Sequence, residues 1–388
     1  MLIALLVASL GLIAFCYVGY PLLVAMQARF SPRPVNAGNW QPHVDVIVVA
    51  YNASESIARK IDNLLALDYP ADRLKLRLGS DGSSDDTVQR ARAHVAQRGC
   101  ENRVSIEAFP MRRGKAACLA DLIAQADSDV LFFTDVRQRV EPVALKALLH
   151  PLADQTVGAV SGELMFERAD GFAGSVDAYW RYEKFIRRNE SASGSVVGVT
   201  GAIWAARRDA LSSIPAGIIL DDVWLPLAIA KRGLRVLFCG EAIAWDKAST
   251  EPAQEALRKR RTLAGNFQLI ANDPSLLWPG SHPLGWRLWG HKWLRLASPW
   301  LFVIALLTNV LVVAKSPWLA LLLALQLLGW IMAAVTFAQP SSQRFLPLRI
   351  AALFARMNLY AAQALFDFIR NRDAHLWSSS TVNPERPR

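Results

Sequence analysis

Long apolar stretches without a charged side chain constrain the fold of this chain more than any other feature. Residues 2–26 contain no charged residue, and residues 298–314 and 317–338 are two further stretches of the same kind. About 20 such residues suffice to cross the hydrocarbon of a bilayer as a helix. Only Lys315 and Ser316 separate the second stretch from the third. The sequence therefore predicts an uncleaved N-terminal membrane anchor and a C-terminal helical hairpin.

Basic residues flank these stretches and predict their orientation. Arg29 and Arg33 follow the first stretch, and basic residues lie on both sides of the hairpin. The positive-inside rule places such flanks in the cytoplasm. A net charge of +10 would also suit a nucleic acid, but the flanks account for it, so no nucleic-acid partner is expected. We expect a multi-pass protein of the cell (inner or plasma) membrane, in contact with membrane lipids, whose central domain is cytoplasmic.

Two segments beside the hairpin are amphipathic. Residues 345–369 are apolar enough to cross, but Arg349, Arg356 and Asp367 are costly in lipid unless they face protein. Crossing as a third C-terminal helix is slightly favoured over lying in the interface. Residues 274–296 interleave tryptophans with basic residues, which is typical of a helix at the headgroup level. A packed soluble surface is the alternative for this second segment.

The middle of the chain has the pattern of an α/β domain. Strands are predicted at 44–50, 74–78, 104–108, 130–134 and 157–162, with helices at 54–67, 85–97 and 115–126 between them. This alternation favours a mostly parallel sheet. With 53% hydrophobic and 20% charged residues, the composition excludes a disordered chain and a wholly soluble globule. We expect an anchor at 1–28, a cytosolic domain at 40–272, an interfacial region at 274–296, two or three membrane helices at 297–370 and a polar tail at 371–388.

Polar clusters follow the predicted strands. Asp81 lies in a Gly-Ser turn, basic residues 112–115 precede a helix, Asp135 ends an apolar strand, and Asp221 and Asp222 open a further helix. Because ligands bind beyond the carboxyl ends of parallel strands, these side chains are candidates for one site. Taken singly, each cluster also fits an ordinary turn, a solvated basic loop or a helix cap.

The clusters in their order resemble a known family. The motifs are residues 46–52 (VIVVAYN), 80–85 (SDGSSD), 113–116 (RGKA), 134–135 (TD), 199–202 (VTGA) and 220–224 (LDDVW). Together they resemble the family 2 inverting glycosyltransferases, and are most similar to the membrane-embedded branch with cellulose, hyaluronan and poly-N-acetylglucosamine synthases. The resemblance implies a Rossmann-like GT-A domain, flanked here by transmembrane helices.

The resemblance also implies roles for single residues. Ala50, Tyr51 and Asn52 would line the nucleoside pocket, and Asp81 would contact the uracil of a UDP-sugar. Lys115 would approach the diphosphate. Asp135 matches the first acid of the DxD motif, which approaches the donor and a Mg²⁺ or Mn²⁺ ion. The remaining implied positions are Asp222 as the base that deprotonates the acceptor hydroxyl with Asp221 beside it, Gly201, Ala202 and Trp224 on the acceptor side, and Arg258 and Arg261 near the leaving diphosphate.

The sequence departs from the family pattern in two motifs. Arg137 stands at the second acid of DxD, so either Asp135 and the diphosphate still hold a metal or the guanidinium itself neutralises charge. The QxxRW motif is degraded, with Arg258 in place of Gln and Thr262 in place of Trp. Since the intact motif accompanies processive synthesis, the resemblance favours non-processive transfer to a lipid-linked or growing glycan acceptor. A processive polysaccharide synthase, a non-catalytic sugar-nucleotide-binding subunit and a transporter component are the alternatives.

Overall fold

The computed structural model describes residues 1–167, 173–247, 252–339 and 345–370, and the chain divides into two compact units. One unit comprises Phe30–Ala169 and Arg187–Gln254 and contains the sheet. The other comprises Met1–Arg29, Asp170–Ile186 and Glu255–Arg370 and is helical. Residues 371–388, the predicted polar tail, lie outside the described residues.

The first of these, the sheet unit, is built on eight strands in the order β3-β2-β1-β4-β7-β6-β8-β5. Strands β3, β2, β1 and β4 run parallel to one another, β7 is antiparallel to both of its neighbours, and β6 and β8 are again parallel. The strands are β1 Val44–Ala50, β2 Leu74–Asp81, β3 Val104–Phe109, β4 Val130–Thr134, β5 Arg139–Val140, β6 Val157–Glu167, β7 Ile203–Arg207 and β8 Arg235–Lys247. The prediction of a mostly parallel α/β sheet is confirmed.

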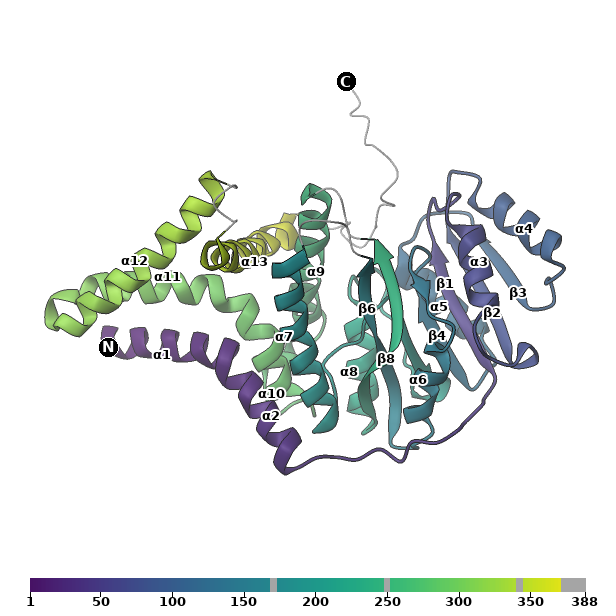
Figure 1. Ribbon diagram of the computed structural model, residues 1–388, viewed down its shortest axis with the longest axis horizontal. Coiled ribbons are helices and arrows are strands. Elements are labelled where there is room, and N and C mark those ends of the chain that lie inside the picture. The colour runs from purple at the N-terminus through teal and green to yellow at the C-terminus, as the bar shows by residue number, and fades with distance from the viewer. Residues whose placement is uncertain (168–172, 248–251, 340–344, 371–388) are drawn as a thin grey trace, which may run out of the picture. The chain divides into compact units, whose positions relative to one another are not determined.

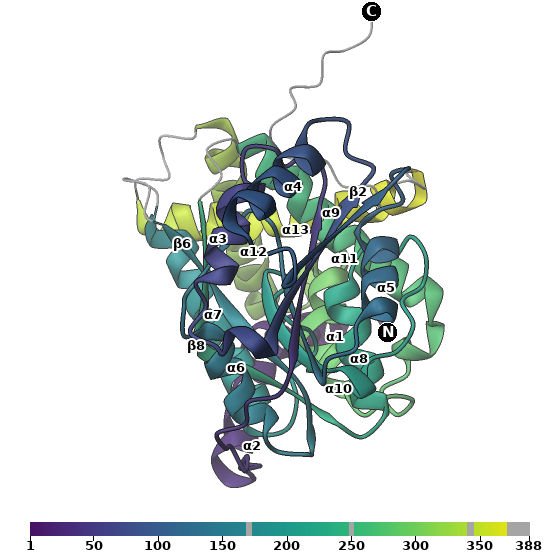
Figure 2. The same ribbon diagram turned by 90° about the vertical axis from the view of Figure 1, so that its right-hand side faces the viewer.

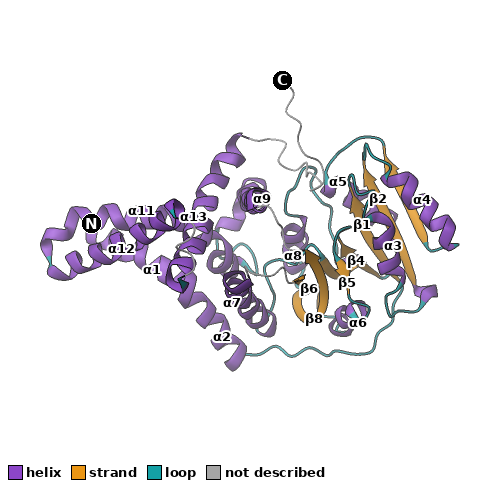
Figure 3. Ribbon diagram, turned by 45° about the horizontal axis from the view of Figure 1, so that its top comes forward, coloured by secondary structure: helices purple, strands orange, loops and turns teal. Residues whose placement is uncertain are grey.

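Helices cover both faces of the sheet, and they bury both rows of side chains of the strand β1. Val46 and Val48 pack with α3 (Ile57–Leu65), α4 (Thr87–Arg98) and α6 (Ala144–Leu152) on one face. Ile47 and Val49, which point the other way in an extended strand, pack with α5 (Lys115–Gln125) and α8 (Asp221–Lys231) on the opposite face. Figure 2 shows α5 and α8 on one side of the strands and α3 and α6 on the other. Figure 3 shows the strands of this sheet between the two sets of helices.

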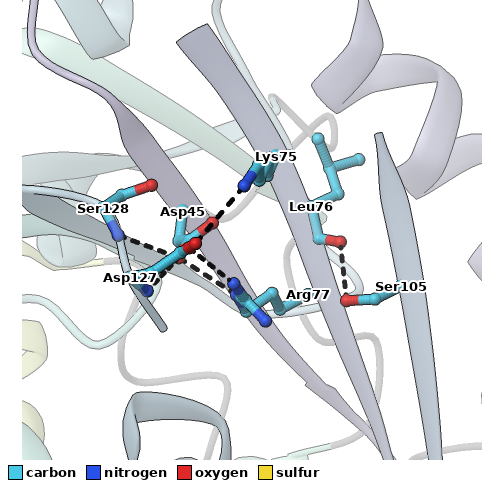
Figure 4. Close-up of polar contacts among 7 residues, drawn as sticks. All are labelled: Asp45, Lys75, Leu76, Arg77, Ser105, Asp127 and Ser128. Carbon is cyan, nitrogen blue, oxygen red and sulfur yellow. Dashed lines mark hydrogen bonds and ion pairs between the residues drawn. The ribbon is translucent and has the colours of Figure 1, made fainter. Parts of the chain in front are cut away.

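A buried ion pair fixes the edge of the sheet at which the parallel strands begin. Asp45, near the start of β1, is fully buried, and its carboxylate lies 3.0 Å from Nε of Arg77 on the neighbouring strand β2 (Figure 4). The same carboxylate accepts a hydrogen bond from the backbone N–H of Asp127, 3.2 Å away, in the turn before β4. Burying this charge is tolerated because it is paired and hydrogen-bonded. The pair is structural, and the opposite, carboxyl edge carries the candidate site.

The helical unit contains the apolar segments that the sequence singled out. Within the described ranges, three helical segments are long and apolar enough to cross a membrane: Leu2–Phe30, Gly285–Lys315 and Pro317–Ala338. The unit's helices are α1 Leu2–Ala14, α2 Tyr20–Phe30, the larger part of α7 (Ala173–Ala192), α9 Pro252–Asn272, α10 Gly285–Leu288, α11 Leu294–Val312, α12 Pro317–Ala338 and α13 Leu346–Arg370. Leu6 of α1 packs against Ala305 and Val312 of α11, and Figure 1 shows these two helices side by side.

The structure bears differently on two predicted segments, the interfacial region at 274–296 and the third C-terminal membrane helix. Residues 285–315 form one continuous helical stretch, so part of the interfacial segment runs directly into the candidate span. Helix α13 is not among the three candidate spans within the described ranges. Its Asp367 pairs with Arg260 of α9 at 2.8 Å, which gives that carboxylate a protein partner. A crossing by α13 therefore stays a prediction.

A buried charge cluster holds α7 to the start of α11 within the helical unit. Glu183 accepts a hydrogen bond from the Arg295 guanidinium and pairs with His291, whose Nε2 lies 3.1 Å from its carboxylate. Burial alone would raise the pKa of Glu183, but the two partners outweigh it and hold that pKa well below its usual range. Glu183 therefore stays ionised, and its charge is the partner of two basic residues, His291 and Arg295, in the apolar stretch 285–315.

Candidate active site

Lys115 and two aspartates meet at the carboxyl edge of the parallel strands. Lys115 is the first residue of α5, Asp135 follows the last residue of β4, and Asp221 is the first residue of α8. The Nζ of Lys115 lies 2.8 Å from Oδ1 of Asp135 and 3.9 Å from Oδ2 of Asp221. Three polar side chains that are distant in the sequence thus lie close together, as the positions of the polar clusters predict.

The charge state of Lys115 follows from its neighbours. Burial by itself would lower the pKa of an ammonium, but Asp135, then Asp221 and Asp222, oppose this and raise the pKa of Lys115 above its ordinary value. Lys115 is therefore cationic at any physiological pH. A fixed cation between carboxylates at a strand edge is suited to receive the phosphates of a ligand.

Asp222 is the second residue of α8 and lies against a close-packed glycine. Its backbone carbonyl accepts a hydrogen bond from the Val199 N–H at 2.8 Å. A Cβ placed on Gly201 would come within 3.2 Å of Asp222 Oδ2, so the absent side chain leaves room for this carboxylate. Asp221 is buried, whereas Asp222 is half-buried. Of the two acids, Asp222 is the one with more access to solvent and to a substrate.

Asp81 is fully buried and organises the loop before α5. Its Oδ1 accepts a hydrogen bond from the Arg113 N–H at 2.7 Å, and its Oδ2 accepts one from the Gly114 N–H at 3.0 Å. The Cys118 thiol also lies 3.3 Å from Oδ1. Asp81 thus holds the residues directly before Lys115, and its contact with a base stays a prediction.

Glycine at position 82 lets this loop approach the end of β2. Gly82 has a φ of +60°, and a Cβ there would lie 2.4 Å from the backbone nitrogen of Arg112. Both the left-handed backbone and the close contact therefore require glycine. Next to this contact, the guanidinium carbon of Arg112 lies 4.1 Å from the centroid of the Tyr51 ring. This cation–π pair places a flat aromatic surface and a cation together at the end of β1.

The other predicted residues take varied positions. Ala50 is buried at the end of β1, and Asn52 ties two turns together, because its Oδ1 accepts the Ser84 N–H at 2.9 Å. Ala202 is buried just before β7, and the Trp224 indole donates to the Ser213 carbonyl at 3.3 Å. Arg258 and Arg261 lie on α9, in the helical unit.

Arg137 lies two residues after Asp135 and is anchored from β8. Its Nη2 lies 2.6 Å from Oδ2 of Asp246, which is buried with 5% of its surface exposed. The Gln138 side chain donates to the same oxygen at 2.9 Å. Two neighbouring residues of the loop after β4 are thus held by one buried carboxylate.

Lys60 supports the same loop from beneath, and sequence analysis missed it. Its ammonium donates to the Thr134 hydroxyl at 2.9 Å and to the Gln138 carbonyl at 2.7 Å. Burial lowers the pKa of Lys60 to about 7, and Asp135 opposes that shift. Its signal in the sequence was present, because Lys60 occupies the buried stripe of α3 with Ile57, Ile61 and Leu64.

The side chains around Asp135 offer few ligands for a divalent metal ion. Mg²⁺ and Mn²⁺ prefer several oxygen ligands. Among the residues that the structure describes, no group of three or more His, Cys, Asp and Glu side chains is placed to hold an ion. Asp135 is already paired with Lys115, and a guanidinium stands at position 137. The expected Mg²⁺ or Mn²⁺ ion stays a prediction.

Comparison with known proteins identifies the family of this chain. Residues 42–265 match the family model described as glycosyltransferase like family 2. A poly-beta-1,6-N-acetyl-D-glucosamine synthase of Staphylococcus aureus (strain COL) is 25% identical over 209 residues, 52% of this chain and 49% of that protein. A beta-monoglucosyldiacylglycerol synthase of Synechocystis is 22% identical over 257 residues, 63% of this chain and 52% of that protein. The chain thus spans about half the length of the curated relatives it matches.

A solved structure shares the fold over nearly the whole chain. It is a mannosyltransferase from Pyrobaculum calidifontis in complex with GDP-Man and Mn²⁺. The TM-score is 0.70 at 23% identity, and the match covers 95% of this chain and 99% of that one. At this identity the likeness shows the fold, which is GT-A.

Proposed function

This chain belongs to glycosyltransferase like family 2, and on that premise we propose that it moves a sugar from a nucleotide-sugar to a hydroxyl group of a lipid-linked or growing glycan acceptor. The enzyme is a glycosyltransferase, and we expect its donor to be a UDP-sugar. The observation that carries the proposal is Lys115, whose ammonium lies between Asp135 and Asp221 at the ligand-binding edge of the sheet.

In the proposed reaction Asp222 is the general base. Its carboxylate takes the proton of the acceptor hydroxyl, and the hydroxyl oxygen attacks the anomeric carbon from the face opposite the nucleotide. The bond from that carbon to the diphosphate oxygen breaks, and the nucleoside diphosphate leaves with the bonding electron pair. The product has inverted configuration. Three features support this role for Asp222: its place beside Asp221 at the start of α8, its half-exposed side chain and the space left by Gly201.

A fixed cation at the carboxyl edge of the strands supports stabilisation of the leaving group. Negative charge grows on the diphosphate as the bond breaks, so cations fixed before the reaction lower the barrier. Lys115 meets this need, because its raised pKa keeps it charged. Tyr51 with Arg112 offers a surface on which a base can stack.

We propose a lipid-linked acceptor and non-processive transfer on two observations. Three apolar helical segments of the described chain are suited to a membrane, which would keep the domain near lipid. One relative is, by its printed name, a synthase of a glucosyl diacylglycerol. The poly-N-acetylglucosamine synthases among the relatives favour the second candidate, a processive polysaccharide synthase. A cytoplasmic orientation of the domain belongs to the same proposal and rests on the basic flanks.

The test is nucleotide release by the full chain in detergent, with a panel of UDP- and GDP-sugars and a membrane lipid extract as acceptor. Asp222→Asn should lower kcat by at least about 100-fold, as loss of a general base does. Asp72→Asn, which changes an exposed acid far along the chain, is the matched control and should keep the wild-type rate. Equal rates for wild type and Asp222→Asn would refute Asp222 as the base. The length of the glycan product decides between single addition and processive synthesis.

A further inference from the structure

The loop after β4 places a guanidinium where the resemblance expects a second metal-binding acid. Arg137 is half-exposed, with 40% of its side-chain surface accessible, whereas its partner Asp246 is almost completely buried. The contact with Asp246 is made through Nη2. A guanidinium carries five N–H donors in a planar fork, so this anchor leaves donors that can reach a phosphate.

The anchor is a built feature of the sheet. Asp246 belongs to β8, the parallel partner of β6, and accepts hydrogen bonds from the side chains of both Arg137 and Gln138. Lys60 donates hydrogen bonds to the carbonyl of Gln138 and the hydroxyl of Thr134. The segment that contains Arg137 is therefore held at Thr134 before it and at Gln138 after it. Such fixing keeps the guanidinium in place before a ligand binds, which is what electrostatic stabilisation requires.

A second cation, Lys115, lies directly beside Asp135. Lys115 approaches its Oδ1 to 2.8 Å, so the place next to this carboxylate is taken by an ammonium. A divalent ion bound to Asp135 would meet the like charge of Lys115, which opposes it.

We propose that Lys115 and Arg137 together carry the charge of the donor's diphosphate in this enzyme, and that transfer needs no divalent metal ion. The inference rests on the proposed function, since it concerns the phosphates of the same donor. Arg137 binds a phosphate oxygen through N–H donors that Asp246 does not use, and Lys115 binds from the α5 side. As the anomeric carbon–oxygen bond breaks, these two cations balance the growing charge on the leaving nucleoside diphosphate.

The experiment is calorimetric binding of UDP and GDP to the full chain in detergent, in EDTA and in Mn²⁺, together with the turnover assay. We expect the same affinity and the same turnover in both buffers. Arg137→Gln should weaken nucleoside diphosphate binding about 10- to 100-fold in both, the loss expected for a charge-assisted hydrogen bond. Arg139→Gln is the matched control, because Arg139 is also exposed and pairs with Glu141 at 3.0 Å. Its affinity should equal that of the wild type.

A second variant reverses the departure from the family pattern. Arg137→Asp creates an acid two residues after Asp135, and we combine it with Asp246→Asn so that two carboxylates do not face each other. This double variant should bind a nucleoside diphosphate weakly in EDTA and regain affinity in Mn²⁺. Tight binding by the double variant in EDTA would show that position 137 carries no phosphate and would overturn the proposal.

The outcomes separate this inference from the proposed function. Binding that is independent of metal and weakened by Arg137→Gln supports the inference even if no sugar is transferred, in which case the proposed function fails alone. Transfer by the wild type that stops in EDTA and returns in Mn²⁺ supports the proposed function and overturns the inference. Absence of nucleoside diphosphate binding in both buffers overturns both.

Discussion

Asp81→Asn is the substitution that best separates loop support from base recognition. The side chain is fully buried, and three donors surround it: the N–H groups of Arg113 and Gly114 and the Cys118 thiol. Asparagine has the same shape but replaces one acceptor oxygen by an NH₂ group. In either orientation of the amide, that NH₂ faces a backbone N–H that has lost its acceptor.

The magnitude follows from these contacts. A buried donor without a partner costs about 1–3 kcal/mol, and the surviving bond weakens because its acceptor is no longer charged. We therefore expect Asp81→Asn to lower the free energy of unfolding by about 2 kcal/mol. For a domain of this size, 1 kcal/mol corresponds to about 2–4 °C in Tm, so Tm should fall by about 4–8 °C.

The assay is thermal unfolding of the full chain in detergent, without nucleotide. Asp121→Asn is the control, because this acid of α5 pairs with the Arg113 side chain at an exposed position and should cost less than about 1 kcal/mol. If Asp81→Asn melts at the wild-type temperature but no longer binds UDP, the reasoning is refuted and Asp81 acts on the base instead.

Two other predictions concern the base and the buried lysine. Gly201→Ala puts a methyl group 3.2 Å from the Asp222 carboxylate and should lower kcat about tenfold with little change in donor KM. Gly198→Ala is the control, because its methyl group meets Val223 at 3.2 Å and only the backbone of Asp222, so this variant should retain the wild-type kcat. Equal losses of kcat in the two variants would argue against Asp222 as the base. Burial lowers the pKa of Lys60 to about 7 in the folded chain, whereas the ordinary lysine pKa is 10.5. Between these two pH values the unfolded chain binds more protons than the folded chain. The contribution of Lys60 to the free energy of unfolding therefore rises with pH across that window. Lys60→Met should remove this rise in denaturant titrations at pH 7 and 9, and parallel pH dependences in both proteins would contradict it.

The sequence predicted the parallel half of the sheet closely, because those strands have a strong local signal. The predicted strands 44–50 and 130–134 coincide with β1 and β4, whose residues are buried on both faces. The predicted strand 74–78 ends three residues before β2 does, since Gly79, Ser80 and Asp81 favour turns by composition. In the structure they stay extended because they pair with Glu107, Ala108 and Phe109 of β3.

Two strands of the other half of the sheet, β7 and β8, were missed for a different reason. Strand β7 is short and contains two alanines and a terminal arginine, and it inserts between β4 and β6. Strand β8 pairs with β6 through a register shift near Gly162 and contains Gly240. Neither strand shows a regular alternation, and both owe their place to partners distant in the sequence.

Some residues of the site could be predicted from the sequence and others could not, and Arg137 shows the difference. Lys115, Asp135 and Asp221 stand at the ends of elements, where the topology brings them together whatever the intervening chain contains. Lys60 and Asp246 stand inside a helix and a strand, and their partners lie 78 and 108 residues away. From the sequence alone Arg137 leaves two possibilities open: a metal held by Asp135 and the diphosphate, or a guanidinium that neutralises the charge itself. Once its buried partner is known, the same residue is a cation fixed in place by Asp246. Because a guanidinium and a divalent ion compete for the same phosphates, this anchor on β8 is the basis of our proposal that the chain's own charge takes the place of a bound metal.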